Sequence, residues 1–231
     1  MFTNSASVVD QGHAHGVDLE ATFDFLNTVD TDNGFPVEKL PSLDVALAWF
    51  VDRGVIHREG ADRARARVAS EPVAGDKDLD RVHAVRSALR EVAESIADKR
   101  APRAAALQTV NRALHARQVI ELVPALDGVN VDHRHIGDPI DDALARLAEP
   151  LVTELTAGHP DRIRVCASDT CEWLFYDASR TSRRRWCDMA TCGNRAKAAR
   201  HRARARSENL ADDAAADDAA TGSPETGSPA T

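Results

Sequence analysis

No segment of the 231-residue sequence approaches the run of about 18 apolar residues that a membrane-spanning helix needs. Residues 1–16 also lack the basic stretch followed by an apolar stretch that marks a secretory signal. We therefore expect a cytoplasmic protein with no membrane segment.

Aromatic residues are scarce as well, at 4% of the chain, whereas apolar residues in total make up 43%. Most of these are Ala, Val and Leu, a composition that suits packed helices better than sheets. The sequence also lacks a Gly-rich phosphate loop, a Gly-x-Ser-x-Gly turn and a His-Glu-x-x-His motif. The composition predicts a mainly helical fold, and we predict that the protein is not an enzyme.

Helix signals begin with Ser42, which can cap a helix over residues 43–51 that ends before Gly54. Apolar residues at three-to-four spacing over residues 79–96 predict one face of a long amphipathic helix. A shorter helix is predicted over residues 107–114.

Asp138-Pro139 marks another helix start, because a cap residue precedes a proline at the first helical position. This helix should reach residue 155, with a kink at Pro150. Residues 118–123 and 129–133 flank Asp127-Gly128 and predict a β-hairpin. We thus expect a loose leader over residues 1–17 and a mainly α N-terminal domain with a small β-hairpin over residues 18–160.

The four cysteines of the chain lie close together in the sequence, at Cys166, Cys171, Cys187 and Cys192. They form two Cys-x4-Cys pairs. A tetrahedral zinc ion takes four thiolates at about 2.3 Å, and each pair can supply two from one tight turn. Residues 163–165 and 173–176 fit strands on either side of the first pair, and a helix can start at Gly193-Asn194. We predict one structural Zn²⁺ in a small treble-clef or ribbon-like module over residues 161–206.

Two disulfides, or a redox-active cysteine pair, are the alternatives. Disulfides are disfavoured in the reducing cytoplasm, and redox pairs usually have a spacing of two residues rather than four. Four thiolates also close the tetrahedron and leave no position for water, so the predicted zinc site is structural rather than catalytic.

The net charge of -8 is divided unevenly along the chain. Residues 162–206 carry 12 Lys and Arg against 4 Asp and Glu, whereas residues 208–231 carry 6 acids and no bases. A basic segment within an acidic protein can still bind nucleic acid. We expect the Ala- and Asp-rich tail, residues 207–231, to be disordered.

Basic residues surround the second cysteine pair and follow it, alternating with Ala in a predicted helix. Guanidinium groups suit phosphate oxygens and guanine edges. We predict DNA contact through eight residues: Arg183, Arg184, Arg185, Arg195, Lys197, Arg200, Arg202 and Arg204. Alternatively, these charges pair with the acidic parts of the chain or with a protein partner.

Cys192-Gly193-Asn194-Arg195, together with Trp186-Cys187 and Cys166-x4-Cys171-Glu172-Trp173-Leu174-Phe175, resembles the CGNR zinc-finger family of bacterial proteins. In that family the finger follows an N-terminal ABATE domain, whose "LDFxNT" opening is similar to Phe23-Asp24-Phe25-Leu26-Asn27-Thr28. The resemblance covers about residues 18–206. It implies a DNA-binding finger in a stress-induced transcription regulator.

Three polar residues stand out in the ABATE-like opening: Asp24, Asn27 and Thr28. Such residues can cap a helix and bond buried backbone groups. They can also line a pocket for a small effector.

We therefore predict a zinc-dependent DNA-binding transcription regulator, whose N-terminal domain senses a small-molecule effector or mediates dimerisation. A homodimer is expected because one small finger makes few contacts for tight specific binding. The alternatives are a zinc-scaffolded protein-interaction module and a small-molecule enzyme activity in the N-terminal domain.

Overall fold

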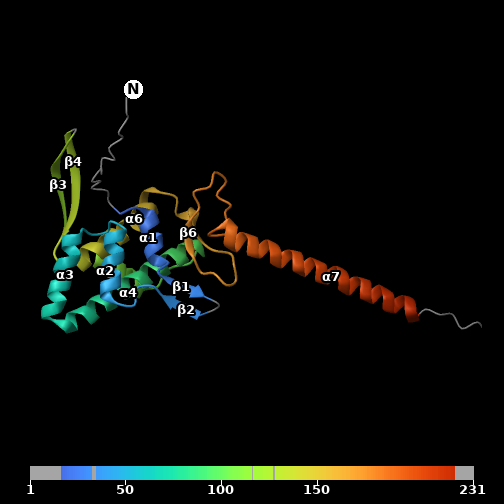
Figure 1. The fold of residues 1–231 in the computed structure, drawn as a ribbon. Helices are drawn as coiled ribbons and strands as arrows, with labels where there is room; N and C mark the ends of the chain where they lie inside the picture. The colour runs from blue at the N-terminus through green and yellow to red at the C-terminus, as the bar shows by residue number, and fades with distance from the viewer. Residues whose placement is uncertain (1–16, 33–34, 116, 127, 222–231) are drawn as a thin grey trace, which may run out of the picture.

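The computed structural model describes residues 17–32, 35–115, 117–126 and 128–221. A body of short and medium helices carries a long helix that projects from one side and a narrow β-hairpin that projects from another (Figure 1). Within the described residues, no helix is both long and apolar enough to cross a membrane.

The helical elements of the described residues, in chain order, are α1 (Leu19–Leu26), α2 (Leu43–Asp52), α3 (Arg58–Ser70), α4 (Pro72–Ala97), α5 (Ala104–Leu114), α6 (Pro139–Ala157), the 3-10 turn η1 (Pro160–Arg162), the π-helical turn η2 (Met189–Gly193) and α7 (Asn194–Thr221). The strands form three antiparallel pairs: β1 (Val29–Asp32) with β2 (Phe35–Glu38), β3 (Arg117–Ala125) with β4 (Gly128–Ile136), and β5 (Ile163–Val165) with β6 (Leu174–Tyr176). The predicted class, mainly α with a small β-hairpin plus a small treble-clef or ribbon-like module, is confirmed.

Local capping signals fix several helix starts. The backbone N–H of Val45 donates to the side chain of Ser42 at 3.3 Å, and that of Ile140 donates to Asp138 at 2.7 Å. Gly54 follows α2 with a φ of +65°, a conformation that glycine adopts without steric cost. These predicted helix boundaries are confirmed, and α6 continues through Pro150.

Helix α4 forms the centre of the body, because it packs against each of α1, α2, α3, α5 and α6. Its buried residues, Val82 and Leu89 among them, meet Phe25, Phe50 and Leu147 in one hydrophobic core. The apolar stripe that predicted this helix is therefore the face around which the body is built.

Several elements were missed. Helix α3 buries only Gly60, Ala61 and Ala64, so it has no stripe of large apolar residues to reveal it. All four residues of β2 are exposed, which removes the alternation that predicts a strand. Helix α1 is eight residues long, too short for a periodic pattern to be decisive.

The tail prediction requires a correction. Residues 207–221 are not disordered in the structure, because α7 continues from the basic segment to Thr221. The frequent alanines of this segment favour helix, and Arg204 pairs with Glu208 one turn further on at 3.0 Å. Residues 1–16 and 222–231, for which a leader and a tail were predicted, lie outside the described residues.

The C-terminal module shares the core of the body. Ile163 of β5 and Leu174 of β6 are fully buried in the same hydrophobic cluster as the helices. The hairpin β5–β6 also contacts α4 and α1. The segments predicted as an N-terminal domain and a finger are thus packed as one unit.

Candidate metal centre and basic surface

The four cysteines come from two separate turns. Cys166 follows β5, and its N–H donates to the carbonyl of Trp173 at 2.9 Å, which closes a first knuckle over residues 166–171. The second knuckle, residues 187–192, runs into η2 and then α7. In this knuckle the Asp188 side chain accepts hydrogen bonds from the N–H groups of Ala190 and Thr191, so it caps the turn.

Folding brings all four sulfur atoms within 4.8 Å of one another. The Sγ atoms of Cys171 and Cys187 lie 3.7 Å apart, as do those of Cys187 and Cys192. A tetrahedron of sulfurs about 2.3 Å from a central ion has edges of about 3.8 Å, whereas a disulfide bond is about 2.05 Å long. All four cysteines are free thiols. The cluster therefore fits a metal site with four thiolate ligands.

The pKa shifts of the thiols are consistent with a cation-binding site. Burial alone would raise the pKa of Cys166, but the N–H groups of Cys187 and Ser168 bond its sulfur and hold the pKa below its usual range. Burial and the neighbouring Cys166 sulfur raise the pKa of Cys171 to about 11, and burial and the other thiols also raise that of Cys187. A negative charge on one sulfur disfavours ionisation of the next thiol, and a bound cation would offset this repulsion.

Aromatic side chains surround the cysteines. Phe175 is buried against Cys166 and Cys192, with Trp173 and Trp186 packed beside them. A Cβ on Gly193 would meet the end of the half-exposed Met189 side chain and lie 3.3 Å from Trp186, so this glycine packs closely within the second knuckle. These aromatic residues form the small core of the module.

Arg184 belongs to the module's own framework. Its guanidinium donates to the carbonyl oxygens of Trp186 and Cys187 and lies 4.8 Å from the centre of the Phe175 ring. Its backbone N–H donates to the buried carboxylate of Asp177 at 2.8 Å. Of the eight residues predicted to contact DNA, this one is already engaged in holding the second knuckle.

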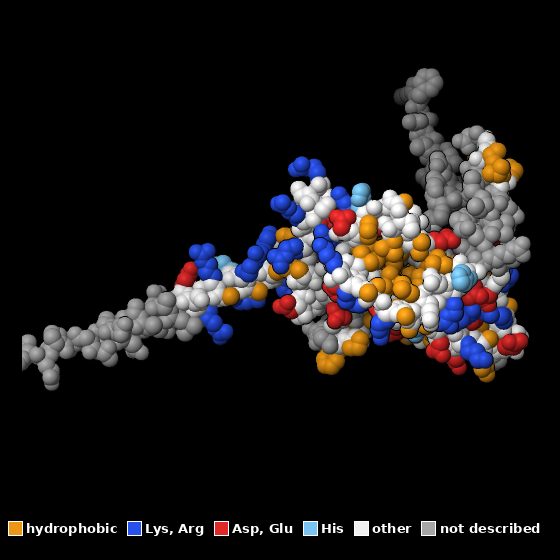
Figure 2. All heavy atoms as spheres, turned by 180° about the vertical axis from the view of Figure 1, so that it is seen from behind, with side chains coloured by type: hydrophobic (Ala, Val, Ile, Leu, Met, Phe, Trp, Pro, Cys, Tyr) orange, Lys and Arg blue, Asp and Glu red, His pale blue; other side chains and the backbone are white. Residues whose placement is uncertain are grey.

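The other predicted basic residues are exposed, on α7 and on the loop before the second knuckle. Lys and Arg side chains gather along the helix and at its junction with the body (Figure 2). Of these, Arg195 donates to Thr170 at 3.1 Å, the Arg185 guanidinium lies 5.2 Å from the Trp186 ring centre, and Arg204 pairs with Glu208.

A groove of about 440 Å³ runs between the first knuckle and α7, and we call it the knuckle groove. Four arginines line it: Arg185, Arg195, Arg200 and Arg202. Asp169 is the only carboxylate in its lining, and Trp186 is part of the wall. The groove concentrates positive charge beside the cysteine cluster.

Asn27 joins the module to the body. Its side chain, 2% exposed, donates to the carbonyl of Leu174 at 2.8 Å and accepts from the N–H of the same residue at 2.9 Å. Asn27 thus extends the edge of β6 as another strand would.

Asp24 and Thr28 have separate partners. Asp24 forms an ion pair with Arg53 at the end of α2. The Thr28 hydroxyl donates to the carbonyl of Phe25 at 2.7 Å and accepts from the buried Arg86 at 2.8 Å. Between these residues, Phe25 and Leu26 are fully buried in the core. The polar residues of the ABATE-like opening bond backbone and side-chain groups here, and they do not converge on one cavity.

Sequence reasoning missed the residues that hold the first knuckle from the body. Arg90 of α4 donates to the carbonyls of Leu26 and Glu172, and Thr31 donates to the Glu172 carboxylate at 3.3 Å. Lys39 lies 4.9 Å from the centre of the Trp173 ring. Nothing in the sequence distinguishes Arg90 from the other charged residues of α4.

A helical body that shares its core with a four-cysteine knuckle module defines a zinc-finger protein. Residues 162–205 match the family model of the CGNR zinc finger, and residues 19–158 match the ABATE model, described as "putative stress-induced transcription regulator". The chain belongs to the ABATE family and carries a CGNR zinc finger. The family description names a regulator rather than an enzyme. No curated protein matches the chain.

Proposed function

We propose that this protein is a DNA-binding transcription regulator in which one structural zinc ion, held by the four cysteines, fixes the basic surface. The knuckle groove is the observation that carries this proposal. Four arginines line it against one carboxylate, and phosphate oxygens are the acceptors that guanidinium groups bind best.

The groove also suits DNA by its position. Arg195, Arg200 and Arg202 line the groove from α7, and Arg185 reaches it from the loop before the second knuckle. A backbone phosphate in the groove would leave Lys197 and Arg204, which are exposed and do not line it, within reach of neighbouring phosphates or base edges.

Zinc would connect the two knuckles through its coordination bonds to their thiolates. The groove has one wall from the first knuckle and the other from α7, which begins just after Cys192. With thiolate ligands on both sides, the ion fixes the spacing between these walls. Its role is structural, because four cysteine ligands leave no open position for chemistry.

Duplex DNA binding by the zinc-loaded full chain, measured by fluorescence anisotropy across a salt series, tests the proposal. We expect the affinity to fall steeply with salt, and Arg200→Gln/Arg202→Gln to reduce the slope of log K against log salt by about 1.8. Arg58→Gln/Arg63→Gln removes the same charge from the exposed surface of α3 and serves as the matched control.

No binding at low salt would overturn the proposal and favour an acidic protein partner for the same groove. Equal losses in the groove variant and the α3 control would show that only net charge matters. Either result would contradict DNA binding in the knuckle groove.

The acids that follow the basic segment should weaken DNA binding. Because α7 is continuous, they lie further along the same helix and cannot fold back onto the groove while the helix is intact. Their charge still repels DNA phosphates. We expect tighter DNA binding when Asn replaces four aspartates, namely Asp212, Asp213, Asp217 and Asp218.

We further propose that the N-terminal part of the protein senses a small ligand or mediates dimerisation, since the knuckle groove alone offers few contacts for specific binding. Sedimentation of the zinc-loaded protein, with and without DNA, tests dimerisation. A monomer that binds a single DNA site tightly would contradict it.

A further inference from the structure

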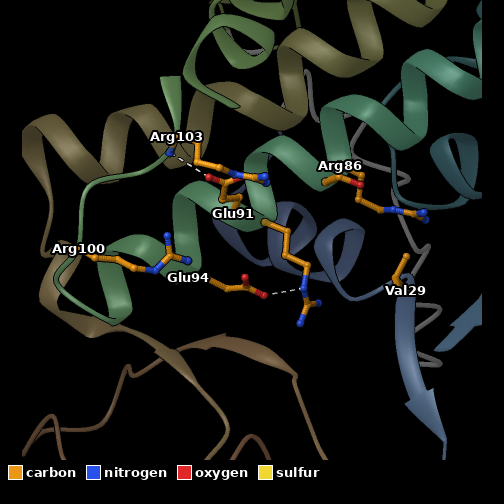
Figure 3. A pocket seen from close by; sticks show the side chains of 8 residues that line it. Val29, Arg86, Glu91, Glu94, Arg100 and Arg103 are labelled. Carbon is orange, nitrogen blue, oxygen red and sulfur yellow. Dashed lines mark hydrogen bonds and ion pairs between the residues drawn. The ribbon is translucent and has the colours of Figure 1, made fainter. Parts of the chain in front are cut away.

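A second cavity lies on the body, along the polar face of α4. It has a volume of about 380 Å³ and is formed by α4, by the segment that follows this helix, and by the start of β1. Arg100 and Arg103 lie at one end of this α4 pocket, and Val29 and Arg86 lie at the other, with Glu91 and Glu94 between them (Figure 3).

Each of the four arginines that line the α4 pocket has an ion pair, and that of Arg100 is the longest. Arg103 is bound to Glu91 through its side chain and backbone N–H, and Arg90 is bound to Glu94 at 2.8 Å. Arg86 is neutralised from outside the pocket by Glu38. Arg100 also pairs with a carboxylate outside the pocket, that of the exposed Asp98, and its Nε lies 3.5 Å from that group.

The backbone directs Arg100 back towards α4. Helix α4 ends at Ala97, Lys99 two residues later adopts the left-handed conformation with φ of 54°, and the N–H of Arg100 then donates to the carbonyl of Ser95 at 2.9 Å. Glycine usually occupies such a position, because a side chain there costs about 1 kcal/mol. The turn at Lys99 has this strained conformation, and it places Arg100 at the edge of the pocket.

The pocket also has apolar surface, and one of its lining residues contacts the finger. Val29 and the methylene groups of the arginines provide an apolar wall. Arg90, which lines the pocket, donates to the carbonyl of Glu172, the residue directly after Cys171. A molecule in the pocket would therefore contact a side chain that holds the first knuckle.

We propose that the α4 pocket binds a small organic acid through its carboxylate, with Arg100 as the anchor and Arg90 as the link to the finger. A ligand carboxylate can replace the long, exposed contact between Arg100 and Asp98, because a planar guanidinium binds a carboxylate through two parallel hydrogen bonds. The volume of the pocket leaves room for a ring or short chain against Val29. The binding of the acid does not depend on the proposed function, whereas its coupling to DNA rests on it.

Titration calorimetry of benzoate into the zinc-loaded full chain, at about 0.15 M salt to screen weak surface contacts, tests the site. We expect one saturable site per chain. Arg100→Gln should weaken binding about tenfold or more, because it removes a charge-assisted bidentate contact. Ser87→Leu, at an exposed position of the pocket lining, should weaken binding by filling the space while every charge remains.

The groove variant Arg200→Gln/Arg202→Gln is the matched control and should bind benzoate like the unchanged protein. Absence of saturable binding, or loss in the groove variant with none in Arg100→Gln, would overturn the site. Inorganic phosphate that binds more tightly than benzoate at the same residues would overturn the carboxylate assignment.

Coupling is measured by the DNA titration with saturating benzoate. We expect the Kd for DNA to change at least about threefold, and Arg90→Gln to abolish the change, since Arg90 connects the pocket to Glu172. An unchanged Kd would overturn the coupling while leaving the ligand site intact. A protein that binds benzoate but no DNA would refute the proposed function and not the pocket.

Discussion

Replacement of Asn27 by Ala tests whether the finger and the body form one folded unit. Asn27 is buried, and its amide makes two hydrogen bonds to the backbone of Leu174 in β6. The alanine variant leaves a buried N–H and a buried carbonyl without these partners. Each such group costs about 1–3 kcal/mol, so we expect the free energy of unfolding to fall by about 2–6 kcal/mol. That is a large share of the 5–15 kcal/mol that is typical of a domain.

Urea unfolding of the zinc-loaded protein measures this loss. Circular dichroism reports on the helices of the body, and tryptophan fluorescence reports on both parts, because Trp49 lies in α2 and Trp173 and Trp186 lie in the finger. The two signals should change in one transition, since Ile163 and Leu174 share the core of the helices.

Two variants control the experiment. Asn111→Ala changes an exposed Asn on α5 and should alter stability by no more than about 0.5 kcal/mol. Asn27→Asp keeps an acceptor for the N–H of Leu174 but loses the donor to its carbonyl, so it also destabilises. A loss below about 0.5 kcal/mol in Asn27→Ala, or two separate transitions in the unchanged protein, would refute the reasoning.

Three further outcomes are expected. Chelation at neutral pH should lower the Tm of the whole chain in one step, reversed by one equivalent of zinc; an unchanged helical melt would contradict the shared core. The bound Arg103 lowers the pKa of Glu91 from 4.5 to about 2, so the stabilisation from this pair is present above pH 4.5 and is lost as the pH falls towards 2. An NMR titration should give that midpoint, and Arg103→Gln should raise it towards 4.5; a midpoint already near 4.5 would disprove the pairing. Glu38→Gln should cost about 3 kcal/mol in urea unfolding, because Arg86 is 3% exposed and would keep a buried charge without its partner. The exposed Asp52→Asn is its control, and equal losses would argue against the buried pair.

The features that the sequence alone determined are local. The spacing of the four cysteines predicted their cluster, because two Cys-x4-Cys turns can each supply two ligands to one metal ion. Ser42 and Asp138 predicted helix starts, since a cap bonds a backbone group only two or three residues away. The apolar stripe of α4 predicted a buried face, because its period matches the turn of the helix.

The tertiary structure decided how distant residues are used. Asn27 and Leu174 are 147 positions apart, and Arg90 and Glu172 are 82 apart, so no local pattern could join them. Arg184 and Arg200 are alike in the sequence, yet the fold gives one to the framework of the second knuckle and the other to the knuckle groove. Side-chain chemistry sets what a residue can bind, and only the packing of the chain sets which partner comes within reach.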